Sequence, residues 1–242
     1  MLALFRDLFS PPRHLILFVI AAWIGLSLAE KRAERHGVSK NDLNSLTFYG
    51  LIAFIIGGRL SFALQNIPAF AKSPLGIFSI NPDLFEPFGA VSVAFITLLI
   101  FGQRHHLSIW SSFDALTLFF VILTAGIGLS HLAAGTAFGN PTNLPWGINL
   151  WNATRHPTQI YEMLASLFIF ALLWFKRPTR QAGIDFLTFA SLLSISHLFL
   201  SAFRADSTII LNGYREEQVV SWLVLATCFV LIEIRFKQSK KG

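Results

Sequence analysis

The sequence predicts an all-α integral membrane protein with seven transmembrane helices. Of its 242 residues, 54% are apolar and only 13% are charged, whereas about a quarter of the residues in soluble proteins are charged. The apolar residues gather in seven segments, each close to the roughly 20 residues that a helix needs to cross a bilayer. We therefore expect a single polytopic membrane domain over residues 1–242.

Charged and helix-breaking residues mark several boundaries of these segments. A mixed-charge stretch follows the first segment after Glu30, and Asp114 suits the opening turn of the fourth. The fifth ends at Lys176, two residues before the helix breaker Pro178. The predicted spans are 14–30, 44–66, 86–102, 113–137, 159–176, 184–203 and 218–235.

The distribution of basic residues predicts the orientation in the membrane. Twelve of the 19 Lys and Arg residues lie in the odd-numbered loops and the C-terminal tail. The positive-inside rule then places the N-terminus outside and the C-terminus in the cytoplasm. No cleavable signal peptide is evident, so the first segment is expected to remain as a span. The aromatic-rich connections 67–85, 138–158 and 204–217 become short, structured extracytoplasmic loops, and we expect a functional site to open outward.

Composition also excludes several classes of site and partner. The single cysteine, Cys228, excludes an intramolecular disulfide and a cysteine-based metal cluster. No soluble basic domain is present, so nucleic acid is not expected as a partner. We expect neither a metal nor a cofactor, and the sequence leaves the oligomeric state open.

A dense polar segment, 155–162, stands at the mouth of the fifth span. Polar side chains there are costly unless they meet partners, water or a ligand. His156 is able to act as a base near neutral pH. Gln159 and Glu162 share a helical face, and Tyr161 points to one side. The segment is either a reactive site or a cap that anchors the span.

Two other spans carry polar residues that point to the bundle interior. Ser194, His197, Ser201 and Arg204 follow steps of three or four residues, which predicts a polar stripe on one face of the sixth span. Arg59 interrupts the second span, where an arginine costs about 2.5–3.5 kcal/mol at the centre. Each arginine is either a contact for an anion such as a lipid phosphate or part of a structural network.

The fourth span ends in small residues between Gly126 and Gly135, which permit close helix packing or leave room for a ligand. His131 lies among them. It is either a base or a hydrogen-bonded packing residue.

Four motifs, taken together, resemble one protein family. His156-Pro157-Thr158-Gln159-Ile160-Tyr161-Glu162 is similar to the His-Pro-Ser-Gln-Leu-Tyr-Glu signature of the prolipoprotein diacylglyceryl transferases. Gly57-Gly58-Arg59-Leu60 resembles the Gly-Ala-Arg-Leu of that family, and the stretch 138–147 resembles its Tyr-Gly-Arg-Pro-Thr-Asp-Leu-Pro-Trp. Phe203-Arg204 matches the arginine that follows its sixth span. The resemblance covers roughly residues 14–235.

The resemblance implies a multi-pass enzyme of the bacterial plasma (inner) membrane. Such an enzyme moves the diacylglyceryl group of phosphatidylglycerol onto the lipobox cysteine in the signal peptide of a prolipoprotein. Its partners are then phosphatidylglycerol, the prolipoprotein and membrane lipid. By this analogy the catalytic residues are His156, Arg204 and His131, and the lipid-binding residues are Arg59, Gln159, Tyr161, Glu162, Gly139 and His197.

Several positions depart from the family pattern. Gly128 stands where the family has an essential arginine, His131 where it has an asparagine and Thr136 where it has a glutamate. Phe88-Gly89-Ala90 replaces a His-Gly-Gly, and Leu200 replaces a tyrosine. Two interpretations follow: a divergent transferase with a rearranged centre, or a non-catalytic relative that binds phospholipid or a lipoprotein precursor. A solute transporter is a third, disfavoured because no internal repeat is visible.

Overall fold

A computed structural model of the chain describes residues 13–72, 76–77, 84–177, 179, 181–210 and 213–239. The chain divides into two compact units, the first formed by residues 1–32 and 113–242 and the second by residues 33–112. A helix occupies each of the seven predicted spans. Among the described residues, six helices are long and apolar enough to cross a membrane, so the chain is a helical, multi-pass membrane protein.

The elements follow one another along the chain with short connections. The helices are α2 (Arg13–Ala33), η1 (Glu34–His36), α3 (Lys40–Gln65), α4 (Ile67–Lys72), α5 (Pro87–Arg104), α6 (Ile109–Ala134), α7 (Thr158–Phe175), α8 (Ile184–Leu200), η3 (Ser201–Phe203) and α9 (Glu216–Ser239). Two antiparallel hairpins pair β1 (Ile148–Leu150) with β2 (Ala153–Arg155) and β3 (Ile209–Ile210) with β4 (Tyr214–Arg215).

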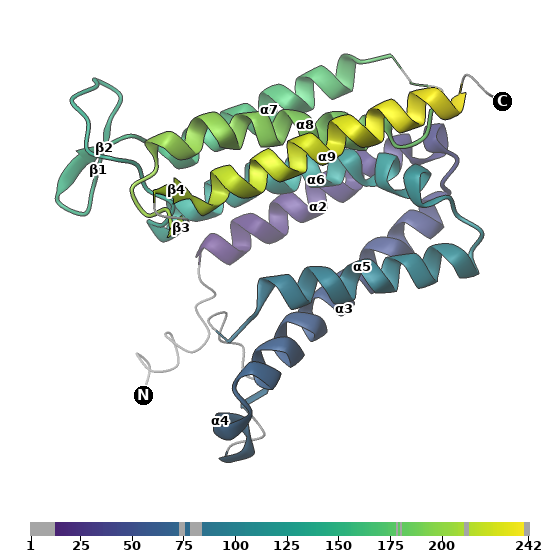
Figure 1. Cartoon of the computed structure of the whole chain (residues 1–242), viewed down its shortest axis with the longest axis horizontal. Coiled ribbons are helices and arrows are strands. Elements are labelled where there is room, and N and C mark those ends of the chain that lie inside the picture. The colour runs from purple at the N-terminus through teal and green to yellow at the C-terminus, as the bar shows by residue number, and fades with distance from the viewer. Residues whose placement is uncertain are drawn as a thin grey trace. The chain divides into compact units, whose positions relative to one another are not determined.

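Helices α2, α6, α7, α8 and α9 make up the first unit, where α8 lies between α7 and α9 (Figure 1). Small residues set the close approaches. A side chain at Gly126 would collide with Ala21 of α2, and one at Gly128 would come within 2.8 Å of the carbonyl oxygen of Gln159 on α7. Close packing by the small residues of the fourth predicted span is thereby confirmed.

The second unit contains the packed pair of helices α3 and α5, together with the short helices η1 and α4. Gly57 of α3 packs directly against Val93 of α5. A Cβ added at Gly57 would lie only 2.6 Å from the Cβ of Val93. Ser39 caps the first turn of α3 by accepting from the amide of Asp42, and Glu86 caps α5 by accepting from the amides of Phe88 and Gly89.

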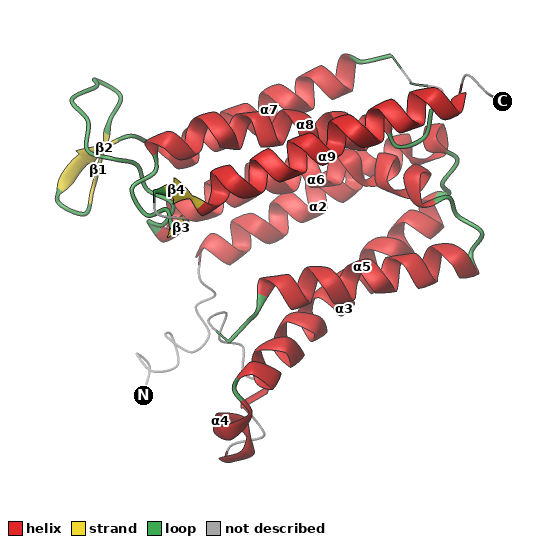
Figure 2. Ribbon diagram, viewed as in Figure 1, coloured by secondary structure: helices red, strands yellow, loops and turns green. Residues whose placement is uncertain are grey.

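The two ends of the first unit differ in chemistry. At one end, Arg32 donates to the carbonyl of Trp174 at 2.7 Å, Arg235 donates to the carbonyl of Ala182 at 3.0 Å, and Lys176 pairs with Asp185 at 2.8 Å. Cations at the C-terminal carbonyls of a helix, as at α7, are favourable. The opposite end carries both strand hairpins (Figure 2).

The predicted end of the fourth span was wrong by a few residues, for a local reason. The fourth span was expected to run to residue 137, but α6 ends at Ala134 because Gly135 adopts a left-handed conformation with φ of 71°. The amide of Gly135 donates to the carbonyl of Leu132, and the amide of Thr136 donates to the carbonyl of His131. This is the hydrogen-bond pattern of a Schellman cap. The sixth span ends at Phe203 as predicted, with its last three residues in a 3₁₀ turn, so Arg204 lies beyond the helix in extended backbone.

Asp114 was expected in the opening turn of its own helix, but α6 begins five residues earlier, at Ile109. Its carboxylate is 4% exposed and accepts hydrogen bonds from the amides of Gly183 (2.6 Å) and Phe186 (2.9 Å). It therefore caps the start of another helix, α8, whose N-cap residue Gly183 has no side chain to do so.

Replacing Asp114 with alanine is expected to lower the unfolding midpoint of the protein in detergent, because two amides at the start of α8 lose their acceptor. The expected cost is about 1–3 kcal/mol. The control is Asp185→Ala, in the first turn of the same helix, whose carboxylate is 20% exposed and pairs with Lys176. Equal losses in thermal denaturation for the two variants would contradict the capping role.

Candidate functional site

A short backbone ladder brings two of the sequence motifs together in the first unit. The segment 138–142 lies against β2, with His156 donating its amide to the carbonyl of Asn140 at 3.0 Å. On its other edge the amide of Asn140 donates to the carbonyl of Phe203 at 2.8 Å, and Gly139 forms a bridge with Arg204. His156 and Arg204 therefore flank one extended segment although 48 positions separate them in sequence.

Gly139 makes this arrangement possible because of its size. A Cβ at this position would lie 2.6 Å from the Cβ of His156 and closer still to its carbonyl oxygen. Gly139 was predicted to bind lipid. In the structure it has a packing role, because it lets the extended segment pass directly beside His156.

The imidazole of His156 lies in an aromatic setting. Its Nδ1 is 3.4 Å from the hydroxyl of Tyr161, one turn into α7. The same hydroxyl accepts a hydrogen bond from the indole Nε1 of Trp146 at 2.8 Å. The ring of Phe203 lies 5.2 Å from the imidazole, centre to centre. His156 and Tyr161, both predicted site residues, are thus brought together.

Three carboxylates surround the guanidinium of Arg204. Nη1 lies 2.5 Å from Glu217 Oε1 and 3.9 Å from Glu162 Oε1, while Nη2 lies 3.0 Å from Asp206 Oδ1. The Arg204 side chain is 16% exposed and that of Glu162 is 10% exposed. We call these four residues the Arg204 cluster. Three carboxyl groups thus face a single guanidinium in this cluster.

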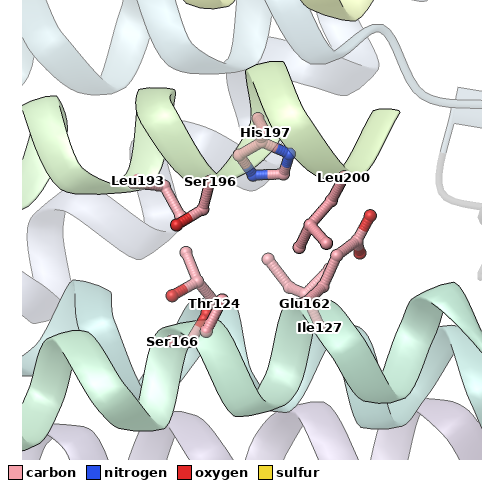
Figure 3. A pocket seen from close by; sticks show the side chains of 9 residues that line it. Thr124, Ile127, Glu162, Ser166, Leu193, Ser196, His197 and Leu200 are labelled. Atoms are coloured by element: carbon pink, nitrogen blue, oxygen red, sulfur yellow. The ribbon is translucent and has the colours of Figure 1, made fainter. Parts of the chain in front are cut away.

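Beside this cluster, α6, α7 and α8 enclose a cavity of about 210 Å³ (Figure 3). Glu162 of α7 and His197 of α8 supply charge and hydrogen-bonding capacity on facing walls, and the rest is largely apolar. The lining residues are Thr124, Ile127, Glu162, Ala165, Ser166, Leu193, Ser196, His197 and Leu200.

The predicted polar stripe of the sixth span faces the bundle interior, but His197 is the only one of its four members that lines the cavity. Ser194 and Ser201 are buried, 5% and 1% exposed, and do not line the cavity. Ser196 takes their place beside His197. Arg204 lies after the 3₁₀ turn, where the helical spacing used for the prediction no longer applies.

Gln159 and His131 occupy different surroundings. Gln159 is completely buried, and its Nε2 donates to the carbonyl of Thr136 at 2.7 Å, which fastens the chain after α6 to the start of α7. His131 lies close enough to Arg204 and Asp206 to interact electrostatically with both. Its buried Nδ1 has no hydrogen-bond partner among the described residues, so it is available to a ligand or to water.

The departures from the family pattern have visible packing consequences. Gly128 faces the backbone of α7 at Gln159 and Met163, so a large side chain at this position cannot be accommodated. Leu200, in place of a tyrosine, lines the cavity. In the second unit, Phe88 replaces a histidine and is 81% exposed.

Arg59 also belongs to the second unit, where its Nη1 donates to the carbonyl of Leu84 at 2.9 Å. Arg204 belongs to the first unit. A shared role for Arg59 and Arg204 therefore stays a prediction.

Sequence reasoning missed three residues of this site. Asp206 and Glu217 hold Arg204, and Trp146 reaches Tyr161. Charged residues next to a predicted membrane boundary were the available signal for the first two, and an interfacial tryptophan was the signal for the third.

The substitution Gly139→Ala is expected to destabilise the protein by about 1–3 kcal/mol, because the added methyl group forces the extended segment away from His156. The measurement is the unfolding midpoint in detergent. Gly102→Ala serves as the control, since a Cβ there would meet its nearest neighbour at an ordinary 3.6 Å. An unchanged midpoint for Gly139→Ala would refute the tight packing.

Comparison with known proteins identifies the family. Residues 14–234 match the prolipoprotein diacylglyceryl transferase family. A phosphatidylglycerol–prolipoprotein diacylglyceryl transferase of Synechocystis sp. is 31% identical, over 85% of this chain and 78% of the relative. Proteins of the same name from Thermotoga maritima and Finegoldia magna are 28% and 26% identical, over 93% and 92% of this chain and 81% and 90% of the relatives. The chain therefore belongs to the prolipoprotein diacylglyceryl transferase family.

Proposed function

We propose that this protein transfers the diacylglyceryl group of phosphatidylglycerol to the lipobox cysteine thiol of prolipoproteins. One observation carries the proposal: the backbone ladder at residues 138–142 holds the His156 segment beside Arg204. Membership of the family supplies the substrate class, since its curated relatives carry that activity in their names.

The proposed reaction is a substitution at carbon. The cysteine sulfur forms a bond to the glyceryl carbon that bears the phosphate ester, and the bond from that carbon to the ester oxygen breaks. The thiol proton passes to a base, and glycerol phosphate leaves with the electron pair of the broken bond. The thiolate is the reactive form of cysteine, so a base beside the thiol speeds the attack.

Arg204 is the proposed electrostatic partner of the leaving phosphate. Charge that develops on the ester oxygen is stabilised by a fixed cationic donor. Asp206 and Glu217 contact the guanidinium at 3.0 and 2.5 Å, whereas Glu162 lies at 3.9 Å. The incoming phosphate would take the place of Glu162, the most distant of the three carboxylates, while the other two continue to orient the guanidinium.

Three histidines have different proposed roles in the reaction. His156 acts beside the reacting groups, held by Tyr161. His131, with its free Nδ1, is the proposed acceptor of the thiol proton. Gln159 and Gly139 keep the surrounding backbone in place, and His197 faces the cavity that would take the glyceryl part of the lipid.

We infer seven spans, with α2 as the first, and an N-terminus outside the bacterial plasma membrane. α2 has 21 residues, which at about 1.5 Å per residue is long enough for the hydrocarbon core. Arg32, Lys176 and Arg235 gather at one end of the first unit, which supports a cytoplasmic placement of that end. The Arg204 cluster, at the other end, would then face outward.

A second candidate function is binding of phospholipid or of a lipoprotein precursor without chemistry. One observation favours it: the α7 backbone fills the space beside Gly128, so α6 offers no cation at the position where the family has its essential arginine. This candidate and the transferase make opposite predictions for rescue of a transferase-deficient cell.

Expression of this protein is expected to restore growth and lipoprotein modification in bacteria depleted of their own transferase. The measurement is the amount of diacylglyceryl-modified prolipoprotein together with the level of this protein in the membrane. Normal membrane levels without rescue would exclude the transferase and favour the binding protein.

The variants His156→Ala and Arg204→Ala are each expected to reduce thioether formation on a lipobox peptide by at least about 100-fold, because each removes a fixed donor beside the charge that develops on the leaving phosphate, and one such donor contributes on that scale. The control is Lys237→Ala, an exposed residue paired with Glu233 in α9, which should retain activity. Full activity in either site variant would remove that residue from the proposed mechanism.

A further inference from the structure

Trp146 is held firmly although its side chain is 57% exposed. It belongs to a turn in which the amide of Gly147 donates to the carbonyl of Leu144 at 3.0 Å. Gly147 packs so closely on the hairpin that a Cβ there would lie 2.6 Å from the Thr154 Cγ2. The indole is therefore aimed by the backbone at Tyr161, which it reaches at 2.8 Å.

The chemistry of these groups restricts where the hydrogens lie. An indole N–H can only donate, so the Tyr161 hydroxyl must accept from Trp146. Among the described residues, the other hydrogen-bond partner of this hydroxyl is Nδ1 of His156, at 3.4 Å. The hydroxyl hydrogen is satisfied there only if Nδ1 accepts it. A neutral imidazole that accepts at Nδ1 carries its own hydrogen on Nε2.

We propose that Trp146 is a positioning residue that, through Tyr161, holds neutral His156 in the tautomer with its hydrogen on Nε2. His156 then presents a hydrogen-bond donor to the substrate instead of a base. Its part in the reaction is to donate from Nε2 to an oxygen of the leaving phosphate. This last step rests on the proposed function, whereas the assignment of the tautomer does not.

The alternative tautomer is disfavoured by the same contacts. With hydrogen on Nδ1, both Trp146 and His156 would donate to the Tyr161 oxygen, and its own hydrogen would point away from every acceptor described around it. Loss of the indole donor removes this constraint, since Tyr161 can then accept from Nδ1. The two tautomers should become more evenly populated.

The test is nitrogen NMR of the full-length protein, labelled with ¹⁵N-histidine and held in lipid nanodiscs. His156→Ala identifies the His156 signals among those of the other histidines. The wild-type signals are expected to show a protonated Nε2 and an unprotonated Nδ1. In Trp146→Phe, which keeps an aromatic ring and removes the N–H, the tautomer ratio should change by roughly two- to tenfold, the effect of one hydrogen bond.

Trp151→Phe is the matched control, because Trp151 lies on the same hairpin but donates its indole N–H to the carbonyl of Gly135 at 3.0 Å. It should leave the His156 signals unchanged. Tyr161→Phe should shift them as Trp146→Phe does, and this variant decides the matter if Trp146→Phe does not fold. A wild-type His156 protonated at Nδ1, or a ratio insensitive to both Trp146→Phe and Tyr161→Phe, would overturn the proposal.

Thioether formation supplies the second readout. Trp146→Phe should lower kcat by roughly two- to tenfold with little change in KM for the lipid, and it should leave the pH at which activity is half-maximal nearly unmoved, because a donor and not the base is affected. A large shift of the pH profile would overturn the donor role. If the protein has no transferase activity but the tautomer responds as expected, the proposed function fails and the assignment of the tautomer holds.

Discussion

The ion pairs of the Arg204 guanidinium organise the end of the first unit at which the motifs of His156 and Arg204 meet. A half-buried arginine at the edge of an apolar bundle is costly unless opposite charges compensate it. Arg204 finds these charges at the starts of two helices, Glu162 on α7 and Glu217 on α9, and at Asp206 just after it. Its own carbonyl accepts from Arg215, which keeps the backbone extended at this point. The extended backbone pairs with Gly139, and Gly139 in turn positions His156.

Much of the fold follows from the sequence because the length of an apolar run is a local property. A helix was expected in each of seven segments and is present in each. The strands were not expected, since pairs of two or three residues are too short to show an alternating pattern. The site was predictable only in part. His156, Tyr161, Arg204 and Trp146 stand in recognisable motifs, whereas Glu217 does not. The contact of Trp146 with Tyr161 and that of Glu217 with Arg204 depend on how the bundle places them.

The departures from the family pattern concentrate on α6 in the first unit. Gly128 replaces the large cation of the family and contacts the α7 backbone directly, and the small residues around it allow the helices to approach closely. The polar groups that remain lie at the start of α7, beyond α8 and at the start of α9, together with His131 near the end of α6. The polar groups of the candidate site therefore come from several elements, and His131 is the one that α6 contributes.

The distribution of these groups along the chain has a consequence for biosynthesis. When α8 leaves the ribosome, Asp114 of α6 has already been made, so the amides at the start of α8 find their acceptor at once. Arg204 is different, because Glu162 precedes it in the chain but Glu217 follows it, at the start of α9. A nascent chain that lacks α9 holds an arginine without its nearest carboxylate. The centre is therefore completed only after α9 has been made and inserted.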